Sequence, residues 1–331
     1  MGVSPDGVGM RTIAAAFALA ALALSAPATH AQAPVPHVGV ILQGGPWYGV
    51  LEGLRAGLKD LNLIEGRHLV LEIRDTRGDL AAAQEAAQAL ENNKVAVIVA
   101  AATSVSVATK KGTRTTPIVY AGGTDPIAVG LVDSVRSPEG RITGVHFSVG
   151  DVTGKRIELL KEMVPHASRV MTFYDPRNSS AAESIKQGRE AAAQLRMTLL
   201  ERHVRTPAEL DSAIQAFGPG EADGYIAVAD AMVDSRTEAL IAMAKRTNLP
   251  TIFYEEGIAR QGALASYGTD FREVGRAAAK YVQRILNGER PGDLPIERLT
   301  ALSFVLNLTT AQQIGLTLPN NALTRADKLL D

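Results

Sequence analysis

The stretch that decides the fold is Lys94–Val132, KVAVIVAAATSVSVATKKGTRTTPIVYAGGTDPIAVGLV. Its two short apolar runs, Val95–Ala100 and Pro117–Tyr120, are rich in β-branched residues, as in strands that are covered on both faces. Small polar residues follow each run, and the segment between the runs predicts a short helix. Ligands of an open parallel sheet bind just outside the carboxyl ends of its strands. The loops after these two strands are therefore the first candidates for a binding site.

The composition of the whole chain is typical of a soluble globular protein. Its 331 residues are enough for two domains with cores of their own, and 46% are hydrophobic and 21% charged. A net charge of −1 gives no basic stripe for nucleic acid. The absence of cysteine excludes disulfides, thiolate metal sites and the acylated cysteine of a lipoprotein.

Residues 1–31 have the features of a secretory signal peptide. An apolar core, Ile13–Leu24, follows Arg11 and precedes the small-residue segment SAPATHAQA. The core is too short to span a membrane comfortably. The mature protein is therefore expected in the periplasm. Alternatives remain for the start and for the cleavage site: Met1 or Met10, and Ala31, Ala28 or Ala33.

After the signal, strands and helices alternate in two series, which predicts two α/β lobes with parallel sheets. The first lobe is expected over residues 37–147 and the second over residues 148–268. Predicted strands of the first lobe, besides those in the opening stretch, are His37–Gln43, His68–Arg74 and Ile142–Phe147. Predicted strands of the second lobe are Ser168–Tyr174, Met197–Val204, Gly224–Ala229, Thr251–Tyr254 and Ala263–Tyr267. A single helix is expected over Ala231–Thr247.

The last part of the chain, residues 271–331, is expected to return to the first lobe. It begins with a predicted helix, Phe271–Leu286, and contains a predicted strand, Ala301–Asn307. In the first lobe, the helix Trp47–Leu61 carries Gly49, Gly53 and Gly57 on one face. Each interior glycine disfavours a helix by about 1 kcal/mol relative to alanine. We expect this face to approach the sheet closely, with a ligand or partner face as the alternative.

Several long segments resemble the ABC-transporter substrate-binding proteins of the tryptophan/tyrosine-type branch. In chain order they are GLRAGLKDLNLIEGRHLVLEIR (53–74), DPIAVGLVDSVRSPEGRITGV (125–145), KRIELLKEMVPHASRVMTFYDP (155–176), ASYGTDFREVGRAAAKYVQRILNGERPGDLPIE (265–297) and LNLTTAQQIGLTLP (306–319). The chain departs from the family pattern at Asp175, at Thr269 and at residues 299–301. Two of these positions, Asp175 and Thr269, lie near the expected ligand cleft, so they bear on the ligand more than on the fold.

This resemblance implies a type I periplasmic-binding-protein fold, in which two Rossmann-like lobes close on a ligand. The lobes would be joined by three hinge strands, at Ile142–Phe147, near Tyr267–Asp270 and at Ala301–Asn307. It also implies an inner-membrane ABC permease and ATPase as partners. We expect a monomer without a cofactor.

No constellation of residues supports catalysis. The histidines are scattered, and no helical pair of them is spaced for zinc. A G-x-S-x-G elbow is absent. The run from Gly150 to Arg156 is one residue short of a P-loop and lacks the hydroxyl after its lysine. The chain is therefore predicted to be a binding protein and not an enzyme.

In the first lobe, the candidate ligand residues follow predicted strands. Helix N-termini and short hydroxyl side chains suit a carboxylate. Thr103 and Ser104 could alternatively be a simple helix cap, and Asp125 could cap a turn. The aromatic pair could stack on a ligand or pack at the surface. The candidates are Trp47, Tyr48, Thr103, Ser104, Thr124 and Asp125.

In the second lobe, an acidic residue after a strand could pair with the ammonium of an amino acid. Asp230 is the leading candidate for this role, with a plain helix N-cap as the alternative. The set after the second-lobe strands is Tyr174, Asn178, Asp230, Tyr254, Glu255 and Tyr267. The predicted function is capture of a small, amino-acid-like, carboxylate or aromatic ligand for an importer. A periplasmic receptor that signals to a membrane kinase or chemoreceptor is the alternative.

Overall fold

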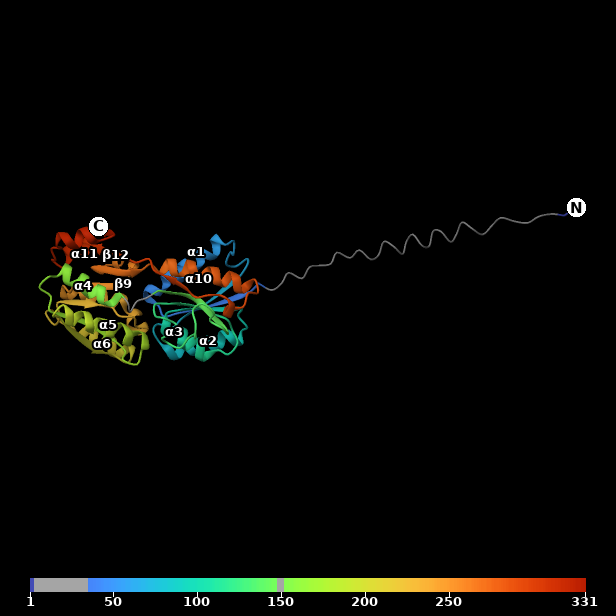
Figure 1. The fold of residues 1–331 in the computed structure, drawn as a ribbon, viewed down its shortest axis with the longest axis horizontal. Coiled ribbons are helices and arrows are strands. Elements are labelled where there is room, and N and C mark those ends of the chain that lie inside the picture. Colours follow the sequence, from blue (N-terminus) through green and yellow to red (C-terminus); the bar gives the residue numbers. More distant parts are fainter. Residues whose placement is uncertain (3–34, 148–151) are drawn as a thin grey trace. The chain divides into compact units, whose positions relative to one another are not determined.

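Two sheets form where the sequence predicts its two series of strands (Figure 1). The computed structural model describes residues 1–2, 35–147 and 152–331, so the predicted signal peptide and residues 150 and 151 of the P-loop-like run fall largely or wholly outside it. Residues 35–331 form one compact unit. Among the described residues, no helix is long and apolar enough to cross a membrane.

The first sheet has six strands in the order β11-β5-β4-β3-β1-β2, and all its pairs are parallel. Apart from β2 and the edge strand β11, its strands are almost entirely buried, as the apolar runs predict. The strands are β1 (His37–Leu42), β2 (Val70–Asp75), β3 (Val97–Ala101), β4 (Ile118–Gly122), β5 (Ile142–Phe147) and β11 (Glu297–Leu299).

Helices cover both faces of this sheet and form with it the first lobe. Helices α1 and α10 lie on one side and α2 and α3 on the other (Figure 1). Their bounds are α1 (Tyr48–Asp60), α2 (Leu80–Asn92), α3 (Thr103–Gly112) and α10 (Phe271–Leu286), with short 3-10 helices η1 (Gly45–Trp47) and η3 (Pro291–Asp293).

The second sheet has seven strands in the order β13-β12-β10-β9-β8-β6-β7, and only the β10–β12 pair is antiparallel among the described pairs. Its strands are β6 (Arg169–Tyr174), β7 (Thr198–His203), β8 (Gly224–Ile226), β9 (Thr251–Glu255), β10 (Ala265–Thr269), β12 (Ser303–Asn307) and β13 (Lys328–Leu330). The second lobe also contains α4 (Thr153–Met163), α5 (Ser179–Gln194), α6 (Pro207–Ala216), α7 (Ala231–Asp234), α8 (Thr237–Thr247), α9 (Glu256–Arg260), α11 (Leu308–Gln313) and α12 (Asn320–Arg325).

The end of the chain corrects one prediction. Helix α10 and strand β11 do return to the first lobe, but β12 and β13 pair within the second sheet. The prediction that the whole of residues 271–331 returns to the first lobe is therefore wrong for residues 303–330, which belong to the second lobe. The reason is that β10 offers an edge to β12: Ala265 pairs with Leu306 and Gly268 with Ser303. The chain passes between the sheets after β5, after β10 and after β11, close to the three predicted hinges.

The glycine face of α1 packs against α10 and not against the sheet. A Cβ atom on Gly53 would lie 1.9 Å from the carbonyl oxygen of Arg272, and one on Gly275 would lie 2.0 Å from that of Val50. Two helices more than 200 residues apart in the chain thus lie side by side (Figure 1). Their close approach explains why interior glycines are kept despite their cost in helix stability.

The helix expected over Ala231–Thr247 is broken. Helix α7 ends at Asp234 and α8 begins at Thr237. Side-chain hydroxyls accompany the break: Ser235 donates to the carbonyl of Met232 at 2.7 Å and Thr237 to that of Asp234 at 2.8 Å. Such local bonds compete with the helical ladder. Because of the break, Asp234 comes at the end of a short helix with a buried side chain.

Candidate functional site

A small cavity, the interlobe cavity, lies where the carboxyl ends of the two sheets face each other. Its volume is about 10 Å³, close to the room that one water molecule needs. Segments that follow β1, β3 and β4 line it from the first lobe, and segments that follow β6 and β8, together with Tyr254 of β9, line it from the second. The lining residues are Gln43, Trp47, Ala102, Thr103, Ser104, Gly123, Ser180, Ala229, Asp230, Ala231, Asp234 and Tyr254.

A buried carboxylate, Asp234, joins the two lobes at this cavity. Its Oδ2 accepts hydrogen bonds from Gln43 Nε2 at 2.9 Å and Trp47 Nε1 at 3.1 Å, both from the first lobe. The hydroxyl of Tyr254, from β9, donates to the same oxygen. Burial raises the pKa of Asp234 to about 8, although the hydrogen bonds from Tyr254 and Trp47 oppose that shift.

A buried cation lies behind this cluster. Arg156, on α4, is completely buried, and its guanidinium carbon lies 5.4 Å from the centroid of the Tyr254 ring. Its Nη2 donates to the Thr153 hydroxyl at 2.5 Å. Burial lowers the pKa of Arg156 to about 10, and the attraction of Tyr254 and Asp234 opposes this. The positive charge of Arg156 therefore partly offsets the cost of the buried Asp234.

The first lobe brings the N-terminus of α3 to the cavity in an unusual conformation. The residue before the helix, Ala102, has φ 105° and ψ 149°, and no side chain caps the helix. A non-glycine residue with such a φ is strained, and strain of this kind concentrates at binding sites. Thr103 Oγ1 lies 2.9 Å from the Tyr120 hydroxyl, which donates to the Thr124 carbonyl at 2.6 Å. This chain of contacts fixes the loops that follow β3 and β4.

In the second lobe, side chains already cap the corresponding helices. Asn178 caps α5 by accepting a hydrogen bond from the Ser180 N–H at 3.0 Å. Asp230 caps α7 by accepting from the N–H groups of Met232 and Val233 at 3.0 and 3.2 Å. Burial raises the pKa of Asp230 to about 6, against the lowering effect of its backbone hydrogen bonds.

Two polar atoms of the cavity lining are buried without a hydrogen-bond partner among the described residues. They are Gln43 Oε1, in the first lobe, and Ser180 Oγ, in the second. An unpaired polar atom in a protein interior costs about 1–3 kcal/mol. One such atom on each side of an interlobe cavity is the pattern that a bound polar ligand would satisfy.

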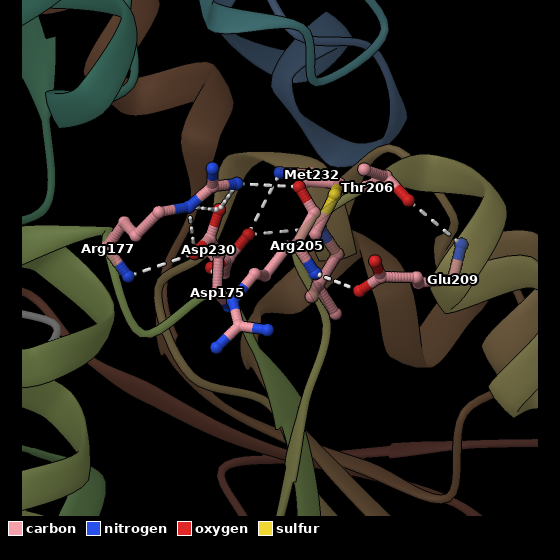
Figure 2. Close-up of polar contacts among 8 residues, drawn as sticks. Asp175, Arg177, Arg205, Thr206, Glu209, Asp230 and Met232 are labelled. Carbon is pink, nitrogen blue, oxygen red and sulfur yellow. Dashed lines mark hydrogen bonds and ion pairs between the residues drawn. The ribbon is translucent and has the colours of Figure 1, made fainter.

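A larger hollow, the mouth pocket, adjoins the interlobe cavity and shares Asp230 and Ala231 with it. Figure 2 shows its second-lobe wall, where the Arg177 guanidinium bridges the Asp175 carboxylate and the Arg205 carbonyl. The backbone N–H of Arg205 donates to Glu209 at 2.8 Å, whereas the Arg205 guanidinium makes no contact with the other residues drawn. The remaining wall comes from residues 78–81 of the first lobe.

The structure brings five predicted residues together in the interlobe cavity lining: Trp47, Thr103, Ser104, Asp230 and Tyr254. Trp47 is not a surface aromatic, because it is buried and its ring lies 4.4 Å from that of Phe271. Asn178 lines the mouth pocket. Thr124 lies next to the cavity through its bond with Tyr120.

The other predicted residues lie outside both hollows. Asp125 caps a turn by accepting from the Ile127 N–H at 2.9 Å. Tyr174 points to the sheet edge, where its hydroxyl contacts Glu201 and His203. Tyr267 packs its ring against Phe304. The remaining two, Tyr48 and Glu255, line a separate surface pocket together.

The other residues of the cavity lining were not among the candidates from the sequence. Gln43 ends the first predicted strand and Ser180 is the second residue of α5, after β6, so both lie just beyond the carboxyl end of a strand, where ligands of a parallel sheet bind. The small residues Ala102, Gly123, Ala229 and Ala231 offered no chemical signal. Asp234 had none either, because its position appeared to be the interior of a longer helix.

Two α/β lobes with a polar cavity between the carboxyl ends of their sheets define a small-molecule binding protein of the type I periplasmic-binding-protein class. The chain belongs to the family of ABC transporter substrate binding proteins, which it matches over residues 37–330. Membership confirms the predicted family and the prediction that the chain is not an enzyme.

Named relatives agree with this assignment. A tyrosine-binding protein of Clostridioides difficile is 24% identical over 267 residues, which cover 80% of this chain and 76% of the relative. A conserved domain protein of Vibrio cholerae has 29% identity and a TM-score of 0.81, covering 89% of this chain and 99% of that structure. An ABC domain from Streptococcus pneumoniae in complex with L-Trp has 21% identity and a TM-score of 0.79, with the same coverage.

Proposed function

We propose that the chain is the periplasmic substrate-binding protein of an ABC importer and that it binds an L-amino acid in the interlobe cavity. The observation that carries this proposal is a pair of buried polar atoms on opposite walls of the cavity, Gln43 Oε1 and Ser180 Oγ, which have no hydrogen-bond partner in the described part of the chain. An empty apolar void would need no such atoms. A polar ligand between the lobes would pair with both.

The lining of the cavity supports an amino acid as the ligand. With a volume of about 10 Å³ the cavity has room for about one water, so the proposal requires the lobes to separate before an amino acid binds between them. Trp47 and Tyr254 supply aromatic surface, and the open N-terminus of α3 suits a carboxylate. The relatives that bind tyrosine and L-Trp favour an aromatic amino acid, whose side chain could extend toward the mouth pocket.

The walls of the cavity suggest how binding leads to delivery. Ligand that contacts Thr103 and Ser104 in one lobe and Ser180 in the other favours the arrangement in which both walls are close. The connections after β5, β10 and β11 serve as hinges in this proposal. The closed, loaded form then docks on an inner-membrane permease, which a cytoplasmic ATPase drives.

Binding is tested by measuring the melting temperature with L-tryptophan, L-tyrosine and the other common L-amino acids. A ligand that binds only the folded state raises the melting temperature as its concentration increases. The variant Ser180→Val should abolish the shift, because it fills the cavity and removes the hydroxyl. Ser179→Val is the matched control, since Ser179 is exposed on the same helix and outside the lining. No shift with any amino acid would contradict the proposal.

Import is tested separately in cells. Deletion of the gene should abolish saturable uptake of the radiolabelled amino acid that gave the largest thermal shift, and Ser179→Val but not Ser180→Val should restore it. Unchanged uptake together with a lost chemotactic or transcriptional response to that amino acid would contradict import and favour a sensing receptor.

A further inference from the structure

Gln43 is the residue of the cavity whose chemistry is most constrained. It follows β1, its side chain is completely buried, and it lines the interlobe cavity. Its Nε2 donates to Asp234 Oδ2, and its Oε1 has no partner among the described residues. The side chain therefore has one engaged end and one unengaged end.

The partners of Asp234 determine which end is engaged. The indole Nε1–H of Trp47 can only donate, so Asp234 Oδ2 acts as an acceptor in that contact. Tyr254 donates to the same oxygen. With Oδ2 in the role of acceptor, Gln43 presents its N–H₂ group there. The unengaged end of Gln43 is then the oxygen, which can only accept a hydrogen bond.

The neighbouring strand supplies the complementary chemistry. Strands β1 and β3 pair in parallel with Ile41 opposite Ala100, and Gln43 and Ala102 each come two residues after this pair, at the same edge of the sheet. Adjacent strands lie about 4.8 Å apart. Ala102 precedes α3, whose first N–H groups have no side-chain cap. An acceptor at Gln43 and the donors of α3 thus share one wall of the interlobe cavity, as binding of the ammonium and carboxylate of one α-amino acid requires.

We infer that Gln43 is a specificity-determining residue, whose Oε1 accepts a hydrogen bond from the protonated amine of the ligand while the first turn of α3 holds the ligand carboxylate. Asp234 positions Gln43 for this role through the bond to Nε2. The inference rests on the proposed function and deepens it, because it assigns the main chain of the amino acid to the first lobe.

Asp230, the sequence-based candidate for the amine, is already engaged. Its carboxylate accepts from the N–H groups of Met232, Val233 and Asp175, the last at 2.8 Å. Figure 2 shows its contacts with Met232 and Asp175. These bonds hold the carboxylate against its own helix and the adjacent loop. Asp230 contributes negative charge near the amine but has no unengaged oxygen comparable to Gln43 Oε1.

The test compares ligands with and without the amine on the variant Gln43→Leu. L-Tryptophan and indole-3-propionate share the carboxylate and the indole, and only the first has an amine. We expect Gln43→Leu to weaken L-tryptophan roughly 10- to 100-fold, as for loss of a hydrogen bond to a charged group. Affinity for indole-3-propionate should stay within about twofold, which also shows that the variant folds. L-Tyrosine and 3-(4-hydroxyphenyl)propionate provide a second pair.

Gln313→Leu is the matched control, because Gln313 is exposed at the end of α11 and outside the cavity; it should change neither affinity. If Gln43→Leu leaves the ratio of the two dissociation constants (amine ligand to non-amine ligand) unchanged, the role of Gln43 is overturned and the proposed function still stands. Failure of the unmodified protein to bind either L-tryptophan or L-tyrosine overturns the aromatic ligand class and the inference with it.

Discussion

The two ends of α7 hold buried carboxylates of the same kind with different partners. Asp230, just before the helix, accepts hydrogen bonds from the backbone of its own helix and of the neighbouring loop. Asp234, at the end of the helix, accepts from Gln43 and Trp47, which are 191 and 187 residues away in the chain. One carboxylate therefore organises local structure, and the other connects the two lobes.

This difference shows that the position of an aspartate in the fold determines which groups it accepts hydrogen bonds from. Asparagine, serine or threonine could also fill the N-cap role of Asp230, although none of them has a second carboxylate oxygen for the Asp175 N–H. The acceptor at Asp234 has three donors that converge on one oxygen and a buried cation, Arg156, nearby. Among the described residues, Asp234 is the side chain that accepts all three of these hydrogen bonds.

Removal of the lobe-connecting carboxylate should have the largest effect. Asp234→Ala leaves the donors of Gln43, Trp47 and Tyr254 buried without their acceptor. We expect the free energy of unfolding to fall by about 3–5 kcal/mol, since each unpaired buried donor costs about 1–3 kcal/mol. Urea denaturation followed by circular dichroism measures this loss. A loss below 1 kcal/mol would show that the cluster does not stabilise the protein.

The dependence of stability on pH should distinguish the two carboxylates next. Burial raises the pKa of Asp230 to about 6 and of Asp234 to about 8, from an ordinary value of 3.8. The unfolded chain then loses these protons at a lower pH than the folded one. The free energy of unfolding therefore falls as the pH rises from about 4 to the folded-state pKa, by roughly 3 kcal/mol for Asp230.

Denaturation at pH 4, 6 and 8 measures the pH effect. Asp230→Asn should remove only the contribution of Asp230 to the fall between pH 4 and 6, whereas Asp234→Asn should remove the contribution of Asp234 from pH 4 to 8. Profiles that run parallel to that of the unmodified protein over the whole range would contradict both assignments.

The smallest effect is expected for the local cap. Asp230→Ala removes the acceptor for the first N–H groups of α7 and should lower the free energy of unfolding by about 1 kcal/mol. Asp230→Asn is the control, because it keeps an acceptor oxygen and should recover most of the loss at pH 4. If Asp230→Ala matches Asp234→Ala in cost, the contrast between local and lobe-connecting carboxylates is wrong.

Much of the fold was accessible from the sequence because its signals are local. The apolar runs of the opening stretch became β3 and β4, and the helix predicted over Phe271–Leu286 is present as α10. The rule that ligands bind at the carboxyl ends of parallel strands placed Thr103, Ser104, Asp230 and Tyr254 at the cavity, since these ends share one edge of the sheet.

The rule failed where a side chain at a strand end turned toward its own lobe. Tyr174 turned toward Glu201 and His203 on the edge strand, and Tyr267 turned toward Phe304. Neighbours on an adjacent strand compete with the cavity for such a side chain, and the sequence does not contain the register that decides the outcome. The helix break before α8 was likewise invisible, because Ser235 and Thr237 tolerate a helix interior until tertiary contacts favour their bonds to the backbone.

By itself, the sequence determined the two series of parallel strands, the helix starts and the family. These depend on the spacing of apolar and capping residues within a few turns of chain. Only the tertiary structure decided that β12 and β13 complete the second sheet, that α1 packs on α10, and that Gln43, Trp47 and Asp234 meet at one cavity. Those contacts join residues far apart in the chain, and their free energy arises only when the packed lobes bring the partners together.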